Sequence, residues 1–251
     1  MARRLANALP RIEPAWQDQG NPIGGQGMVP TRPETDPDHA AVPACDGTDA
    51  LPQPGFGECR INASDLACRR GDRLLFARLS FAVQGGETLH LAGPNGVGKS
   101  SLIRILAGLL PPWAGNVARQ GAVALLDERL ALDMHQPLGR ALEFWARCDL
   151  LEPQDMNRIA SAAELDDLLD VPVRYLSTGQ RRRAALARTL GRGAPIWLLD
   201  EPLNGLDARS VATMGGMMTK HCASGGICII ASHQMLPAPV TRRIDIADFL
   251  P

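Results

Sequence analysis

The chain has 251 residues, with 26 Lys and Arg against 27 Asp and Glu, so its net charge is −1 at pH 7. This length fits one large α/β domain, or one medium domain with an extension. The balanced charge excludes the strongly basic surface of a protein that wraps nucleic acid or coats anionic lipid. The longest apolar runs, such as 196–199 and 227–231, fall far short of the roughly 20 residues that span a bilayer.

Residues 1–57 are predicted to form a disordered extension. They are rich in Pro and Gly and poor in large aliphatic side chains, so they cannot bury enough apolar surface to offset the entropy lost on ordering. The N-terminus has no apolar core of signal-peptide length, so no secretory signal is expected. A partner-binding tail and a translation start at Met28 or later are alternative interpretations of this segment.

A globular domain is predicted over residues 58–251, where strand-like and helix-like patterns replace the Pro and Gly punctuation. Its first part has predicted strands at 60–65, 74–81 and 88–92, a helix at 100–110, a strand at 122–126 and a mostly helical middle over 138–169. Its last part alternates a helix at 179–190, a strand at 196–199, a helix at 210–222 and a strand at 227–231. This alternation predicts an α/β fold with a parallel sheet and crossover helices.

Cysteine spacing points away from metal and haem chemistry. The six cysteines form no CxxC pair, no CxxCH haem-attachment site and no zinc spacing, so we interpret them as reduced thiols of a cytosolic protein and expect no direct haem binding. They are Cys45, Cys59, Cys68, Cys148, Cys222 and Cys228.

The strongest motif is GPNGVGKS at 93–100, which matches the phosphate-binding loop GxxxxGK[ST] and lies between a predicted strand and a predicted helix. Its glycines allow backbone N–H groups to surround phosphates, Lys99 reaches the β- and γ-phosphates of ATP, and the Ser100 hydroxyl is a ligand for Mg²⁺. The predicted nucleotide-binding residues here are Gly93, Pro94, Asn95, Gly96, Val97, Gly98, Lys99, Ser100 and Ser101.

Two carboxylates follow the apolar run IWLL at 196–199. Ligands bind at the carboxyl ends of strands in open α/β sheets. Asp200 is therefore predicted to hold Mg²⁺, and Glu201 to polarise the water that attacks the γ-phosphorus, because phosphoryl transfer needs a positioned nucleophile.

The sequence LSTGQ at 176–180, followed by a basic helix, resembles the LSGGQ signature of the ABC ATPases. Taken alone, it also fits an ordinary Ser cap before a helix. The resemblance implies a P-loop NTPase of the ABC type, with a mostly parallel sheet, an antiparallel β subdomain and a small helical subdomain at about 128–180. It implies further that Ser177, Gly179 and Gln180 contact ATP held by a second subunit, so that the working unit is a homodimer.

The same resemblance assigns two further positions and leaves two in doubt. Asp207 falls in the D-loop NGLD at 204–207, and His233 takes the place of the switch histidine that contacts the γ-phosphate. Where the family has a Mg²⁺-sensing Gln this chain reads Asp127-Glu128-Arg129; Glu128 is the expected stand-in, with Gln136 a weaker alternative. Where the family stacks an aromatic residue on adenine this chain has Arg70, which either stacks its guanidinium there or is solvated.

The folded part also resembles the CcmA family, the ATP-binding subunits of the cytochrome c maturation haem exporter. The resemblance rests on CRRG at 68–71, LSF at 79–81, RILAGLL at 104–110, PVRYLS at 172–177 and LAR at 186–188. It implies ATP hydrolysis with Mg²⁺, an integral-membrane permease as partner, and a peripheral place on the cytoplasmic face of a bacterial inner membrane. Another small ABC transporter for lipid, drug or metal is the first alternative. A soluble ABC ATPase acting on DNA or ribosomes is less favoured, since this chain has one compact cassette.

Overall fold

The computed structural model describes residues 55–127 and 131–250, which belong to one compact unit, Asp49–Pro251. The predicted extension therefore lies almost wholly outside the described residues, as does Glu128. Phe56 is described: its N–H donates to the Ser224 carbonyl, and its ring lies 4.9 Å from that of His221. The boundary at residue 58 stays a prediction, but Phe56 contacts the domain.

A three-stranded antiparallel sheet in the order β2-β1-β4 forms one layer. Its strands are β1 (Arg60–Arg70), β2 (Arg73–Gln84) and β4 (Ala114–Gln120). The first two were predicted, although each extends beyond the expected range. β4 was not predicted, because all of its residues except Val117 are exposed and it lacks an alternating apolar face.

A five-stranded sheet, parallel throughout, forms the next layer in the order β5-β6-β7-β3-β8. Its strands are β5 (Val123–Leu126), β6 (Ile196–Asp200), β7 (Ile227–Ala231), β3 (Thr88–Ala92) and β8 (Arg242–Asp245). The edge strand β8 was not predicted, since its sequence RRID contains one apolar residue. The predicted α/β fold with a mostly parallel sheet and an antiparallel part is confirmed.

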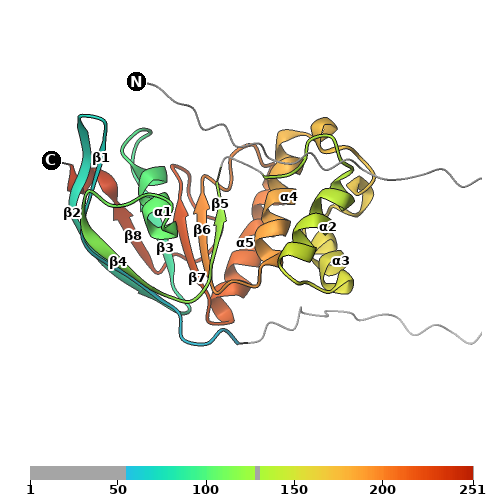
Figure 1. Cartoon of the computed structure of the whole chain (residues 1–251), viewed down its shortest axis with the longest axis horizontal. Helices are drawn as coiled ribbons and strands as arrows, with labels where there is room; N and C mark the ends of the chain where they lie inside the picture. Colours follow the sequence, from blue (N-terminus) through green and yellow to red (C-terminus); the bar gives the residue numbers. More distant parts are fainter. Residues whose placement is uncertain (1–54, 128–130, 251) are drawn as a thin grey trace, which may run out of the picture. The chain divides into compact units, whose positions relative to one another are not determined.

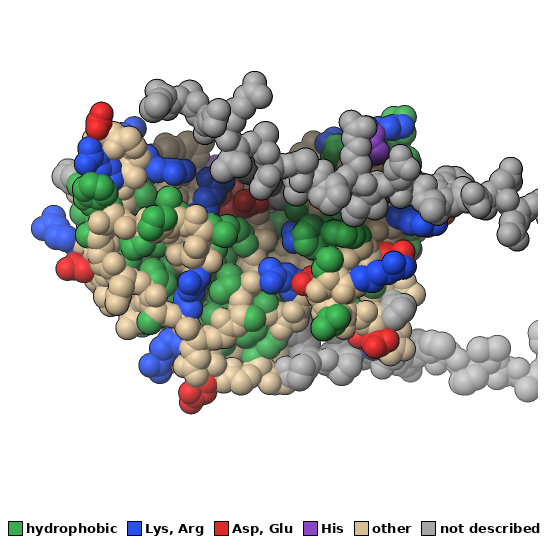
Figure 2. All heavy atoms as spheres, in the orientation of Figure 1, with side chains coloured by type: hydrophobic (Ala, Val, Ile, Leu, Met, Phe, Trp, Pro, Cys, Tyr) green, Lys and Arg blue, Asp and Glu red, His purple; other side chains and the backbone are tan. Residues whose placement is uncertain are grey.

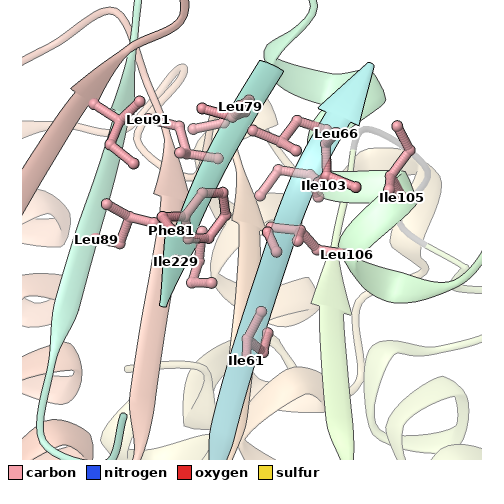
Figure 3. Close-up of a cluster of buried hydrophobic side chains, with 14 of the residues drawn as sticks. Ile61, Leu66, Leu79, Phe81, Leu89, Leu91, Ile103, Ile105, Leu106 and Ile229 are labelled. Carbon is pink, nitrogen blue, oxygen red and sulfur yellow. The ribbon is translucent and has the colours of Figure 1, made fainter. Parts of the chain in front are cut away.

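Both faces of the parallel sheet are covered, which explains why every residue of its central strands β6, β7 and β3 is buried. In β6, Ile196 and Leu198 pack into the cluster shared with the antiparallel sheet and α1 (Lys99–Ala107). Figure 3 shows the part of this cluster where side chains of α1 lie among those of β1, β2, β3 and β7. The alternate residues of β6 face the second cluster, with α4 (Thr178–Gly191) and α5 (Ala208–Ala223).

The middle of the chain forms the helical part, in which α2 (Leu138–Cys148) and α3 (Pro153–Ala162) pack against each other and against α4. Their shared core includes Leu138, Leu142, Ile159 and Leu165. Short 3₁₀ turns η1 (Asp166–Leu168) and η2 (Val173–Tyr175) lead back to α4, and η3 (Ile246–Phe249) follows β8. In Figure 1 these helices lie on the side of the parallel sheet away from the antiparallel sheet.

Helix α1 ends earlier than predicted. The expected end was residue 110, but Gly108 adopts a left-handed conformation with φ 78° and its N–H caps the carbonyls of Arg104 and Ile105. A glycine in this conformation stops the helix before the two prolines at 111 and 112 can.

Among the residues described, no helix is long and apolar enough to cross a membrane. Acidic and basic side chains are mixed over the face drawn in Figure 2, in keeping with the near-zero net charge.

Candidate active site

Three parallel strands bring the predicted site residues to one edge of the sheet. The loop 93–98 follows β3, Asp200 is the last residue of β6 and Glu201 comes directly after it, and His233 comes two residues after β7. Because β3, β7 and β6 are neighbours with parallel registers, their carboxyl ends meet. This edge is where ligands bind in open α/β sheets.

The backbone conformation and the close packing of the phosphate-binding loop require glycine at several positions. Gly93, Gly96 and Gly98 have φ of 130°, 80° and 116°, a region that other residues adopt only with strain. A Cβ on Gly98 would lie 3.0 Å from the Phe76 ring, and one on Gly93 would lie 3.0 Å from Val97 Cγ1. The Val97 side chain is itself buried in the core, so it anchors the loop.

Lys99 is the first residue of α1, and its side chain is buried. Its Nζ donates to the Gly93 carbonyl at 2.8 Å and to the Pro94 carbonyl at 3.2 Å, so the ammonium lies across the loop. The same Nζ is 3.7 Å from Glu201 Oε1. The predicted cation and the predicted catalytic carboxylate are thus within ion-pair distance.

The carboxylate of Glu201 has two partners, one for each oxygen: Oε1 lies 3.7 Å from Lys99 Nζ, and Oε2 lies 3.0 Å from His233 Nδ1. A carboxylate only accepts hydrogen bonds, so Nδ1 is the donor. Glu201 has φ 46°, a left-handed conformation that costs a non-glycine residue about 1–3 kcal/mol and persists only where its surroundings enforce it. Its N–H donates to the Ala231 carbonyl at 2.8 Å, which ties it to the end of β7.

A hollow of about 360 Å³ lies over these groups. Its lining comprises Leu75, Asn95, Gly96, Gly98, Lys99, Ser100, Ser101, Glu201, Asn204 and His233. Eight of these ten were predicted site residues; Leu75 and Asn204 were not. Asn204 could have been identified, because it begins the D-loop at 204–207. Leu75 gave no such signal, because its side chain has no polar atom.

Oxygen donors suited to a magnesium ion are present at this edge. Ser100 lines the hollow, and Asp200, only 2% exposed, ends β6. Mg²⁺ prefers oxygen ligands and usually keeps several from water and substrate phosphates. In the described part of the chain, no group of three or more His, Cys, Asp or Glu side chains is placed to hold a metal. A hydroxyl and a carboxylate therefore fit an ion that takes its other ligands from a nucleotide and water.

The signature forms a capping box at the start of α4. The Gln180 N–H donates to Ser177 Oγ at 3.2 Å, and the Ser177 N–H donates to Gln180 Oε1 at 2.8 Å. A Cβ on Gly179 would lie 2.9 Å from the Gly205 carbonyl oxygen, so signature and D-loop are in close contact. None of the signature residues lines the hollow of its own chain.

Three other predicted positions lie away from the hollow. Asp207 caps α5 by accepting from the Ser210 N–H at 2.8 Å, a bond that lowers the pKa of its carboxyl. Arg70 is exposed at the β1–β2 turn and is not part of the lining. Gln136 lines a separate hollow beside α2.

Comparison with known proteins agrees with this geometry. A family model described as ABC transporter matches residues 76–204. An ABC transporter ATP-binding protein from Pyrococcus furiosus superposes with a TM-score of 0.68 at 22% identity, covering 76% of this chain and 100% of that one, which shows the fold. The fold, the hollow and the family match define an ATP-binding, ATP-hydrolysing subunit of the ABC transporter class.

Two curated relatives narrow the family. The cytochrome c biogenesis ATP-binding export protein CcmA of Novosphingobium aromaticivorans is 59% identical over 194 residues, covering 77% of this chain and 99% of that protein. The protein of the same name from Sphingopyxis alaskensis is 53% identical over 174 residues, covering 69% and 90%. This chain belongs to the CcmA family, as its sequence predicted.

Proposed function

We propose that two copies of this chain bind ATP with Mg²⁺ between the phosphate-binding loop of one copy and the signature of the other. Hydrolysis then drives an integral-membrane permease of cytochrome c biogenesis, with the chain lying peripherally on the cytoplasmic face of the bacterial inner membrane. The observation that carries the proposal is the Glu201 carboxylate, placed between Lys99 Nζ at 3.7 Å and His233 Nδ1 at 3.0 Å over the hollow.

The chain's own residues divide the chemistry. Loop N–H groups and Lys99 bind and neutralise the phosphates. The Glu201 carboxylate accepts a hydrogen bond from water and orients that water toward the γ-phosphorus. His233 holds that carboxylate through its other oxygen, Oε2. Mg²⁺ bound by Ser100 and Asp200 would neutralise developing charge on the phosphate oxygens.

The signature supports action between copies. Ser177 and Thr178 are exposed at the N-terminal end of α4. They do not line the hollow that lies over the phosphate-binding loop of the same chain. A helix N-terminus favours anions because its first N–H groups lack intrahelical acceptors. A second copy can therefore present its γ-phosphate here.

The surface beside α2 supports docking of the permease. A second hollow, of about 640 Å³, is lined by residues of α2 and the segment just before it, including Ala131, Gln136 and Trp145. Phe144, also in its lining, is 60% exposed. Glu128 and Arg129, which precede this segment, lie outside the described residues; we propose that charge reversals there uncouple the permease while sparing nucleotide binding.

A deletion strain tests the proposal. Without this chain, c-type cytochromes should fail to acquire covalent haem while b-type cytochromes persist, and a plasmid copy carrying Lys99→Ala should not restore them. A copy with Glu164→Gln serves as the control, because this carboxylate contacts Arg183 and Arg209 and does not line the hollow. Normal c-type cytochromes in the deletion strain would favour a different small ABC transporter.

A further inference from the structure

Arg182 lies in the first turns of α4, two residues after the signature. It is nevertheless buried, with only 7% of its surface exposed. Its guanidinium donates to backbone carbonyls from two separate segments. The first segment follows β5 and supplies the Asp127 carbonyl, at 2.9 Å. The second lies where β6 ends and supplies the carbonyls of Asp200, Glu201 and Pro202.

The chemistry of the side chain matches this arrangement. A guanidinium presents five N–H donors in a rigid planar fork and stays charged, so it can satisfy several carbonyls at once. A buried charge without such acceptors would be strongly unfavourable. The three carbonyls of Asp200, Glu201 and Pro202 are consecutive, so one side chain fixes the path of the backbone through the proposed catalytic residue.

That path is the strained one. Glu201 has φ 46°, and its surroundings must hold it in this conformation. The Ala231 carbonyl binds its N–H, while Arg182 binds its carbonyl and the carbonyls on either side. A relaxed backbone would turn the carboxylate away from Lys99 and His233.

We propose that Arg182 is a positioning residue for hydrolysis: it holds the Glu201 backbone in the left-handed conformation that places the carboxylate between Lys99 and His233. The inference rests on the proposed role of Glu201. It predicts that losing Arg182 lowers turnover without loosening nucleotide binding, because the phosphate-binding loop makes no hydrogen bond to this guanidinium among the described contacts.

Arg183 provides a matched control on the same helix. Its guanidinium donates to the Glu164 carbonyl at 3.1 Å and lies 3.5 Å from the Glu164 carboxylate, with the side chain 18% exposed. It therefore ties α4 to the end of the α3 segment instead of to the site. Arg183→Gln measures what it costs to remove a largely buried arginine from α4.

The test uses the transporter complex purified through a tag on the full chain, with kcat, KM for ATP, binding of a fluorescent ATP analogue, and Tm measured for each variant. Arg182→Gln should lower kcat by about 10- to 100-fold, the scale of misplacing a reacting group, while KM and analogue binding stay within about twofold. Arg183→Gln should lower Tm comparably and keep kcat within about twofold. Arg182→Lys, with three donors on a flexible stem, should restore part of the loss.

An equal kcat in Arg182→Gln and Arg183→Gln, or a rise in KM that accounts for the whole loss, overturns the inference. If Arg182→Gln does not fold, Arg182→Lys and Arg183→Lys decide, since only the first should lose turnover. Glu201→Gln run in parallel separates the two levels. If Glu201→Gln is inactive while Arg182→Gln keeps the turnover of the parent, the proposed function stands and the positioning role falls; if Glu201→Gln is active, both fall.

Discussion

Replacing Glu201 by Gln should separate nucleotide binding from hydrolysis. The amide keeps the shape of the side chain but removes the charge 3.7 Å from Lys99 Nζ. At an effective dielectric constant of about 20, the lost attraction is about 4 kcal/mol. In the parent this attraction competes with the phosphates for Lys99, so the variant should bind ATP at least as tightly. Turnover should fall by about 100-fold or more, because a positioned base typically contributes 10²–10⁴.

The assay combines phosphate release with gel filtration in ATP, in which a nucleotide-stabilised dimer of the Glu201→Gln variant should accumulate. Glu164→Gln is the matched control, since it neutralises a carboxylate that contacts only Arg183, Arg209 and Thr213 among its hydrogen-bond partners in the described residues. Hydrolysis by Glu201→Gln at near the parent rate would falsify the assignment of Glu201.

Three further outcomes follow from contacts in the structure. Lys99→Ala should weaken nucleotide binding itself, measured with a fluorescent ATP analogue; unchanged affinity would contradict its role. Removing residues 1–54 should leave Tm and ATPase activity unchanged. Removing 1–57 should lower Tm, because it also removes the Phe56 ring, which lies 4.9 Å from the ring of His221. Burial lowers the pKa of His221 from 6.5 to about 4, so the unfolded chain takes up a proton that the folded chain does not. Stability should therefore fall by up to about 3 kcal/mol as pH falls from about 6.5 through 4, and His221→Phe should flatten this dependence in denaturant titrations.

The sequence predicted those parts of the fold whose pattern is local. Strands β6 and β7 contain the continuous apolar runs 196–199 and 227–231, and the glycines and lysine of the loop have fixed spacing. The edge strands β4 and β8 were missed because their residues are mostly exposed and their pairing comes from neighbours distant in sequence.

Arg182 shows what motif reading overlooks in the site. The sequence presents the arginine run 181–183 only as part of the basic helix that follows the signature, with no separate role for each residue. Helical spacing does not distinguish them, because Arg181, Arg182 and Arg183 are each followed by buried residues at the third and fourth positions, within the run Ala184, Ala185, Leu186 and Ala187. The acceptors could not be foreseen, because they are backbone carbonyls whose positions depend on the tertiary fold.

The signature likewise had two interpretations, a helix cap or a nucleotide contact, and the structure makes them compatible. Ser177 Oγ accepts the N–H of Gln180, the third residue of α4. The N–H groups of the first two residues, Thr178 and Gly179, have no intrahelical acceptor by helix geometry. Gly179 carries no side chain that could shield these N–H groups. A Cβ at this position would lie only 2.9 Å from the Gly205 carbonyl oxygen. The cap therefore fixes the helix end and leaves two N–H donors for an anion. The signature does not line the hollow of its own chain, which is why we propose that the anion is the nucleotide of a second copy.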